Sequence, residues 1–539
     1  MPSKSFNKKK QLMTQAKSIN RIVILGGGSA GWLTAGVIAA EHCAGGQDSS
    51  GLTNVTITLV ESPNISTVGV GEGTWPSMRS TLQKMGISET DLITKCDASF
   101  KQGTLFYNWR TGNGDSYTHP FTVPHGYNDT NLADQWRRFR HSIPFAEAVS
   151  SQNSLMFNDL APKQITTPEY AFNANYGYHL DAAKFADLLR FHCVENLNVK
   201  HVIADMVGVN SHDSGDISSL IVDTEKKIEG DLFIDCSGSR ALLLGEFYKV
   251  PLTSKKKFLF NDTALASQVP YCSNNDPIAS STIASAQTNG WIWDIGLPTR
   301  RGIGHVFSSA HSNEDEVSQK LLKYIKKTVS AEAASKTSIR KISFSPGHRA
   351  KFWHKNCVAI GMSAGFIEPL EASALVLVEL SASMLSDQLP ANRKVMDIVA
   401  KRFNDKFLYR WDAIIDFLKM HYILSERKDT DYWKDNVSPV SIPDSLAEKM
   451  DLWCWQSPWH RDTMHVDEMF PSASFQYVLY GMGFHTQARL TNRRSESEAQ
   501  NSAEQLFQEN AQRTKKMMAS MPTNRELINK IHTYGLQKI

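Results

Sequence analysis

A glycine-rich segment near the N-terminus carries the clearest chemical signal in the sequence. Gly26, Gly28 and Gly31 have the spacing G-x-G-x-x-G, which permits a tight turn, close approach of the backbone to a pyrophosphate, and close packing of a helix on a strand. An apolar run at 22–25 precedes the glycines and a helical pattern follows them. The amino end of such a helix attracts phosphate groups. Glu61 ends the next β-branched run, where a carboxylate accepts hydrogen bonds from ribose hydroxyls. The pattern predicts a dinucleotide site, although its distance to Glu61 exceeds the usual roughly 20 residues.

The glycine pattern alone fits either NAD or FAD. No second G-x-G-x-x-G follows a strand, so no separate nicotinamide site is expected. Two later apolar runs, 231–236 and 357–360, are each followed by a glycine turn and read as further strands of the same sheet. This discontinuous arrangement favours FAD. The segment from Gly361 to Phe366 is expected to place a glycine turn and a helix start beside the flavin ring.

These elements require an α/β fold with a large core. The chain has 539 residues, 41% of them hydrophobic and 21% charged, which excludes wholesale disorder, collagen and coiled coil. We expect an FAD-binding Rossmann-type module, similar to glutathione reductase and single-component monooxygenases, with inserted substrate-binding elements. The expected organisation is a polar tail at 1–20, a discontinuous FAD-binding module at 21–395, and a mainly helical region at 396–539 that completes the substrate pocket.

The charge balance and the cysteines exclude several functions. Lys and Arg number 58 against 55 Asp and Glu, a net charge of +3 that favours neither nucleic-acid nor membrane-surface binding. No apolar run approaches the roughly 20 residues that span a bilayer. The seven cysteines are scattered without a C-x-x-C pair, which predicts free thiols, no zinc site and a cytoplasmic location. No second histidine stands near His421 at metal-ligand spacing, so it is expected to be a packed, hydrogen-bonded residue.

Several segments, in a shared order, resemble the flavin-dependent halogenases usually called tryptophan halogenases. The resemblance runs from about Arg21 to the C-terminus. The matching segments are 26–32 (GGGSAGW), 68–76 (VGVGEGTWP), 100–101 (FK), 106–110 (FYNWR), 291–295 (WIWDI), 366–371 (FIEPLE), 416–422 (DFLKMHY) and 429–433 (DTDYW).

The resemblance implies a reaction and the residues that perform it. Reduced FAD, O2 and chloride or bromide would give hypohalous acid, which Lys101 would receive and pass to an electron-rich aromatic substrate, with indole-type compounds the best guess. Glu371 would be the catalytic carboxylate. The implied cofactor residues are Gly26, Gly28, Ser29, Ala30, Gly31, Glu61, Val70, Gly71, Gly361, Gly365 and Phe366. The implied substrate and tunnel residues are Trp291, Trp293, Pro76 and Phe106, with no metal.

The family resemblance also implies partners. The enzyme would use a separate NAD(P)H-dependent flavin reductase, a small aromatic substrate and no nucleic acid or membrane, and could form a homodimer. Three positions depart from the family pattern: Gly296 replaces a proline, Ala372 replaces a serine, and Met362 replaces a polar residue. The first departure leaves the Trp pair intact. The second puts halide contacts at residue 372 in doubt, and the third removes a possible hydrogen bond to the flavin.

Alternative readings exist for individual residues and for the whole chain. Most lysines are solvated, and without the flanking motifs Lys101 would be interpreted as a solvated surface lysine. We expect Glu368 and Glu371 to lie at the start of a helix and to share one of its faces. Glu368 would then be a first-turn acid that complements the helix dipole. Trp291 and Trp293 would either form a wall between substrate and flavin or be two residues of the hydrophobic core. The alternative functions are a flavin monooxygenase that hydroxylates its substrate and a non-catalytic flavin-binding protein.

Overall fold

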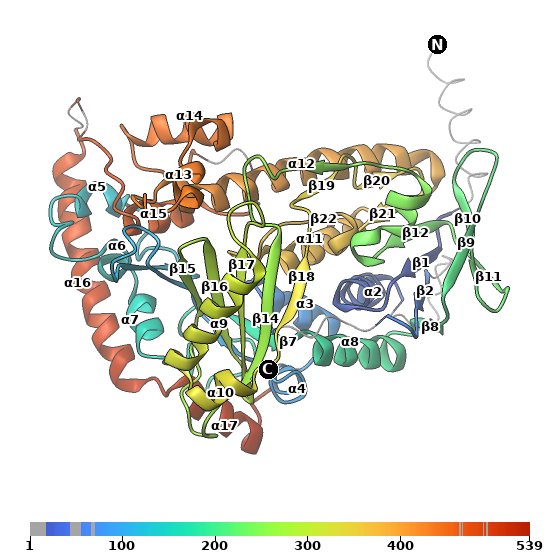
Figure 1. The fold of residues 1–539 in the computed structure, drawn as a ribbon, viewed down its shortest axis with the longest axis horizontal. Coiled ribbons are helices and arrows are strands. Elements are labelled where there is room, and N and C mark those ends of the chain that lie inside the picture. Colours follow the sequence, from blue (N-terminus) through green and yellow to red (C-terminus); the bar gives the residue numbers. More distant parts are fainter. Residues whose placement is uncertain are drawn as a thin grey trace, which may run out of the picture.

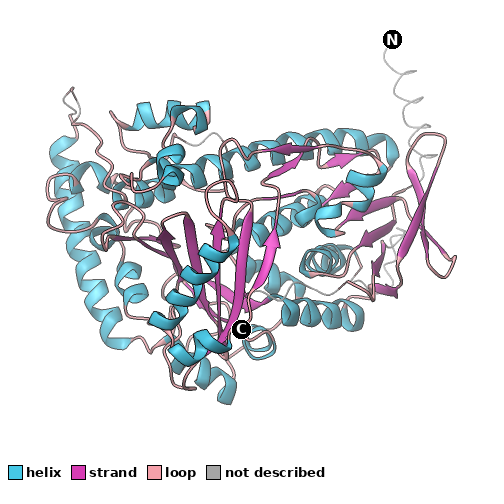
Figure 2. Cartoon of the chain, in the orientation of Figure 1, coloured by secondary structure: helices cyan, strands magenta, loops and turns pink. Residues whose placement is uncertain are grey.

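The computed structural model describes residues 18–43, 55–65, 71–462, 465, 467–488, 490–491 and 494–538. Most of the expected tail and Val70 lie outside these residues. A parallel sheet with its helices occupies one end of the molecule, a large, mainly antiparallel sheet lies in the middle, and helices form the other end (Figures 1 and 2). The chain is therefore α/β with a helical C-terminal part, as expected.

The parallel sheet confirms the discontinuous module. Its six strands have the order β20-β21-β12-β1-β2-β8, and all neighbours are parallel except β20 and β21. β1 is buried along nearly its whole length because α2 packs on one face of the sheet and a small antiparallel sheet, which includes residues 217–222, packs on the other. The strands are β1 (Arg21–Leu25), β2 (Thr56–Glu61), β8 (Lys200–Ile203), β12 (Leu232–Asp235), β20 (Trp353–His354) and β21 (Cys357–Ala359).

Helix α2 (Ser29–His42) follows β1 directly and packs against two other helices, α8 and α11. Asp181 begins α8 by accepting hydrogen bonds from the backbone N–H groups of Ala183 and Lys184. The helices between β2 and β8 are short except α8. Their bounds are α3 (Ser77–Met85), α4 (Glu89–Lys95), α5 (Leu132–Trp136), α6 (Phe145–Val149), α7 (Ser151–Phe157) and α8 (Ala182–Asn196). Helix α11 (Ser373–Asp387) comes later in the chain, before α12.

The middle sheet has seven strands in the order β18-β14-β17-β16-β15-β5-β6. Only β15 and β5 pair in parallel. Helices α9 (Glu314–Thr328) and α10 (Ala331–Lys336) cover one face, where Val317, Leu321 and Ile325 pack on the sheet (Figure 1). The strands are β5 (Gly103–Tyr107), β6 (Ser116–Pro120), β14 (Thr263–Pro270), β15 (Thr282–Gln287), β16 (Gly290–Gly296), β17 (Arg300–Phe307) and β18 (Arg340–Ser343).

Three further sheets have three strands each, and the one formed by β9, β10 and β11 lies at the outer end of the parallel sheet (Figure 1). In one of them, β7 lies between β3 and β4 and brings the 71–73 segment close to Lys101. The strands of the small sheets are β3 (Gly71–Gly73), β4 (Ser99–Lys101), β7 (Gly177–Asp181), β9 (Met206–Ser211), β10 (Ile217–Val222), β11 (Lys227–Glu229), β13 (Leu252–Ser254), β19 (Gly347–Arg349) and β22 (Gly365–Phe366).

Beyond the sheets the described chain is helical. Helix α12 (Arg393–Ile423) runs from the parallel-sheet end to the helical end (Figure 1), and the expected boundary at 395/396 falls in its first turn. Among the described residues, no helix is long and apolar enough to cross a membrane. The remaining helices are α13 (Asp431–Asn436), α14 (Asp444–Trp453), α15 (Ser472–Gly481), α16 (Glu496–Ser520) and α17 (Asn524–Tyr534).

Candidate active site

A cavity of about 400 Å³ opens at the carboxyl ends of β1 and β2. This is the edge at which parallel α/β sheets bind ligands. The cavity extends from Glu61, through the glycine turn, to Gly361 and Phe366 at the start of the segment before α11. Eight of the predicted cofactor residues line it: Gly26, Gly28, Ser29, Ala30, Glu61, Gly361, Gly365 and Phe366.

The three motif glycines serve different purposes. Gly26 has a φ of +119°, and a Cβ there would lie 2.2 Å from the carbonyl oxygen of Cys236. A Cβ on Gly31 would lie 1.9 Å from the carbonyl oxygen of Gly26. Gly28, by contrast, has an ordinary φ of −76°, and a Cβ there would meet no protein atom within 4 Å. Only Gly28 therefore keeps space open for a ligand, at the uncapped amino end of α2.

Glu61 lies where the sequence predicts, at the end of β2. One of its carboxylate oxygens lies 2.8 Å from Nε2 of His201, and a Cβ on Gly27 would lie 2.1 Å from its carboxyl carbon. The carboxylate is thus fixed beside the glycine turn, in position to accept hydrogen bonds from a ribose. Together with the open space at Gly28, this arrangement fits a dinucleotide such as FAD.

Other predicted cofactor residues lie outside the cavity wall. Gly31 packs against the glycine turn, and a Cβ on Gly71 would face Ile295 and Gly302. Glu72, which the sequence did not single out, lines the cavity instead. Met362 also lines it and is 43% exposed. Neighbouring residues of a strand face opposite sides, so Glu72 of β3 faces the cavity and Gly71 does not.

A second pocket, of about 130 Å³, lies between the middle sheet and the C-terminal helices. Of the predicted residues, Pro76 and Glu371 line it. The sequence missed the rest of the wall because its members come from β6, α15 and the loops beside them. The principal members are Trp75, His119, Phe121, Phe470, Ser474 and Tyr477.

Glu371 is held by two histidines that contact the same oxygen. Nδ1 of His119 lies 3.0 Å from Oε1 of Glu371, and Nε2 of His421 lies 3.3 Å from it. Tyr117 and Ser474 contact the outer nitrogens of these imidazoles, at 2.6 Å and 2.9 Å. His421 is thus buried and hydrogen-bonded, as expected, but its place beside Glu371 was not foreseen.

The two histidines determine the charge of Glu371. Burial alone would raise the pKa of this carboxyl, but the charge and hydrogen bonds of His119 and His421 outweigh it and lower the pKa to about 2. Because a carboxylate only accepts hydrogen bonds, Nδ1 of His119 must carry a proton. Glu371 is therefore anionic, and its Oε2 forms no hydrogen bond with any described residue.

The expectation that Glu368 and Glu371 open a helix is wrong. Helix α11 begins at Ser373, and Ala372 before it adopts a left-handed conformation with φ +53°. Glu368 is fully buried and accepts three hydrogen bonds of 2.7 Å, from Asn261, Trp291 and Tyr422. Its role is to join the segment before α11 to β16 and α12, rather than to complement a helix dipole.

Lys101 is buried between the two cavities, 1% exposed. A Cβ on Gly73 would lie 3.0 Å from its Nζ and 3.1 Å from Cβ of Ala372, so the ammonium group packs between these backbones. Among the described residues it has no hydrogen-bond or ion-pair partner. Burial lowers the pKa of Lys101 to about 8, against the attraction of Glu371 and Glu72. The surface alternative for this lysine is wrong.

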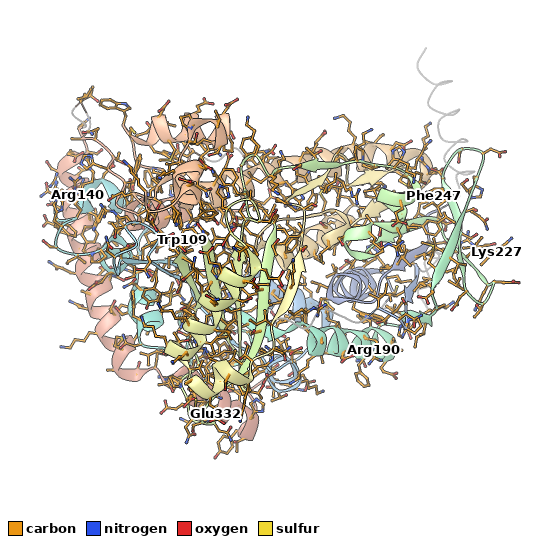
Figure 3. All side chains as sticks on the ribbon, in the orientation of Figure 1. Trp109, Arg140, Arg190, Lys227, Phe247 and Glu332 are labelled. Atoms are coloured by element: carbon orange, nitrogen blue, oxygen red, sulfur yellow. The ribbon has the colours of Figure 1, made fainter. Side chains whose placement is uncertain are left out.

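The predicted tunnel aromatics lie in the interior rather than on a cavity wall. Trp291 and Trp293 share one face of β16, with ring centroids 6.4 Å apart, and Phe106 stacks on Tyr117. Neighbouring Trp109 is fully buried in the same region (Figure 3). None of the three predicted aromatics lines either described cavity. A barrier between substrate and flavin remains a prediction for the Trp pair. No cluster of metal-ligating side chains occurs among the residues that the structure describes.

The fold and the two cavities define a dinucleotide-binding protein of the FAD type with an adjoining aromatic pocket. The family model "Tryptophan halogenase" matches residues 21–496. The chain therefore belongs to the tryptophan halogenase family, whose members are flavin-dependent halogenases, and it is an enzyme of that class.

Curated relatives and solved structures agree with this assignment. The tryptophan 7-halogenase KtzQ of Kutzneria sp. (strain 744) is 29% identical over 95% of this chain and 98% of its own length. A tryptophan halogenase structure from Shewanella frigidimarina NCIMB 400 is 50% identical, with a TM-score of 0.93 over 97% of this chain and 99% of its own. BrvH, a flavin-dependent halogenase from Brevundimonas sp. BAL3, is 28% identical, with a TM-score of 0.81 over 95% and 99%.

Proposed function

We propose that this chain is a two-component halogenase that uses reduced FAD, O2 and chloride or bromide to halogenate an indole-type aromatic. The observation that carries the proposal is the buried, unpaired ammonium of Lys101 between a dinucleotide cavity and an aromatic pocket. Bound reduced FAD would supply hypohalous acid on one side of this lysine. Lys101 would receive the halogen there and present it to the substrate on the other side.

The remaining roles follow from the positions of the side chains. Gly28 and the amino end of α2 would hold the pyrophosphate, and Glu61 the ribose. Glu371, kept anionic by His119 and His421, would stabilise the cationic ring that forms during electrophilic attack and accept its proton. The histidines would keep Oε1 engaged, so the proton would go to the free oxygen, Oε2.

The pocket supports a small aromatic substrate without charged groups. Its volume is about 130 Å³, and Trp75, Phe121 and Phe470 provide flat apolar surfaces. Glu371 and His119, which contact each other, are the only Asp, Glu, His, Lys or Arg side chains among the described residues of its wall. An amino-acid zwitterion would lose its hydration without finding opposite charges there, which is costly. We therefore propose indole or an uncharged indole derivative in preference to free tryptophan.

The proposed partner is a separate NAD(P)H-dependent flavin reductase in the cytoplasm, because the sequence offers no nicotinamide motif. The test combines the purified chain with such a reductase, FAD, NADH, indole and either chloride or bromide. Mass spectra are expected to show the isotope pattern of a halogenated product that requires the halide. A product heavier by one oxygen would instead identify a monooxygenase, and bound FAD without any product would identify a binding protein.

A further inference from the structure

Glu72 is a carboxyl group on the cofactor side of Lys101 to which the proposed chemistry gives no role. It lies on β3, lines the cofactor cavity, and is partly exposed. Among the described residues it forms no hydrogen bond and no ion pair. Gly73, the next residue, faces the opposite side of the strand and packs directly against Nζ of Lys101. The charges of two carboxyl groups therefore act on the lysine: Glu371 in the aromatic pocket and Glu72 in the cofactor cavity, across β3.

The residue opposite Glu72 on β7 is apolar Leu180, and among the described residues Lys101 is the charge that acts on Glu72, from the other side of β3. On β7, burial and the nearby Lys101 hold the pKa of His179 well below its usual value, so this imidazole is neutral. Asp181 on the same strand is paired with Arg300 of β17 at 2.7 Å. On β16, the contact with β3 is made by apolar Ile295.

Glu72 is already balanced between its two protonation states near neutral pH. Burial raises the pKa of its carboxyl to about 7, while attraction to Lys101 opposes the rise. A ligand that fills the cavity removes water from the carboxyl. A dinucleotide also brings the negative charge of its pyrophosphate into the same cavity. Both effects favour the neutral acid.

We propose that Glu72 is a proton-linked group of the cofactor site, which takes up a proton when FAD binds and faces the cofactor as a neutral carboxylic acid. This inference rests on the proposed use of FAD. The proton comes from solvent and forms the O–H bond of the carboxyl, and no electrons move. A neutral carboxyl can donate a hydrogen bond to the cofactor, which a carboxylate cannot.

The test counts the protons exchanged when oxidised FAD binds to the protein. Isothermal titration calorimetry at pH 8 is run in two buffers of different ionisation enthalpy, on the wild type and on Glu72→Gln. The difference between them isolates Glu72, because Lys101 is present in both. We expect the wild type to take up as much as about one proton more per FAD than the variant, and its FAD affinity to fall by up to about tenfold per pH unit relative to the variant above pH 7.

A matched control separates this role from burial alone. Glu379 on α11 is buried, and burial also raises the pKa of its carboxyl to about 7, but it does not line the cavity. Glu379→Gln is expected to keep the wild-type proton count. The proposal is overturned if Glu72→Gln binds FAD with the wild-type count, or if Glu379→Gln loses it.

Two further outcomes are informative. If the wild type does not bind FAD at all, the proposed cofactor is wrong and this inference falls with it. If Glu72→Gln loses FAD binding, Glu72→Asp retains an ionisable carboxyl and must restore both binding and proton uptake. FAD binding by Glu72→Asp without proton uptake would overturn the proposal.

Discussion

The glycine turn of the cofactor cavity is built from backbone, whereas the aromatic pocket is built from side chains of distant segments. Gly26, Gly28 and the amino end of α2 form that part of the cavity within a few residues of sequence. In the aromatic pocket, His119 of β6, His421 of α12 and Ser474 of α15 meet around Glu371. A backbone site tolerates change poorly and keeps one ligand class, while a side-chain pocket can alter its substrate by substitution. Lys101 stands where the two meet.

Replacement of Lys101 tests the boundary between the two regions and should have the largest effect. Lys101→Met keeps the length of the buried chain but removes the amine, so we expect halogenation to fall by roughly 10²- to 10⁴-fold. FAD binding should stay within a few-fold of the wild type, because Lys101 does not line the cofactor cavity. Product formation and flavin fluorescence titration measure the two. Halogenation near the wild-type rate would remove Lys101 from the mechanism.

The glycines test whether the cofactor side is built from backbone. Gly28→Val should fold normally and lose FAD affinity by at least about 100-fold, because its side chain enters open space that the pyrophosphate needs. Gly31→Val should instead fail to fold, because its Cβ would overlap a carbonyl oxygen. Thermal unfolding and fluorescence titration distinguish the outcomes. Undiminished FAD affinity in folded Gly28→Val would place the pyrophosphate elsewhere.

The pH dependence tests how the aromatic side controls the lysine. With the pKa of Lys101 lowered to about 8, its free amine increases as pH rises toward that value. The single-turnover halogenation rate should therefore rise by up to about tenfold per pH unit and level off near pH 8. Glu371→Gln removes an attraction that favours the ammonium, so the inflection should move to lower pH. A rate that falls through pH 8 would indicate that the ammonium, not the amine, handles the halogen.

Substrate preference tests the side-chain pocket and should give the smallest effect. We expect kcat/KM for indole to exceed that for free tryptophan by about tenfold, equivalent to roughly 1.4 kcal/mol. The reason is that no Lys or Arg lines the described wall of the pocket, and His119 there is already engaged with Glu371. Competition between the two substrates, followed by mass spectrometry, measures the ratio directly. A preference for tryptophan would show that partners for its charged groups exist.

The amino-acid sequence by itself determined the parts of this protein that depend on local geometry. The spacing of Gly26, Gly28 and Gly31 after a buried strand specifies one turn, and β-branched runs specify the strands beside it, so Gly26, Gly28 and Glu61 lie on the cavity wall. Glu371 and Lys101 were reached through family motifs. The prediction was wrong at Gly71, because side chains alternate along a strand and a shift of one residue moves a side chain to the other face. Glu72, not Gly71, lines the cavity.

Only the tertiary structure decided which side chains surround the catalytic carboxylate. His119 and His421 are 302 residues apart in number, and no local pattern connects them with Glu371. The same is true of Glu368, whose three partners lie on three separate segments. Periodicity indicates which face of an element is buried, but not which faces meet across a core. The protonation states of Lys101, Glu72 and Glu371 depend on these packing contacts, because burial and nearby charges shift a pKa away from the usual value of the residue type.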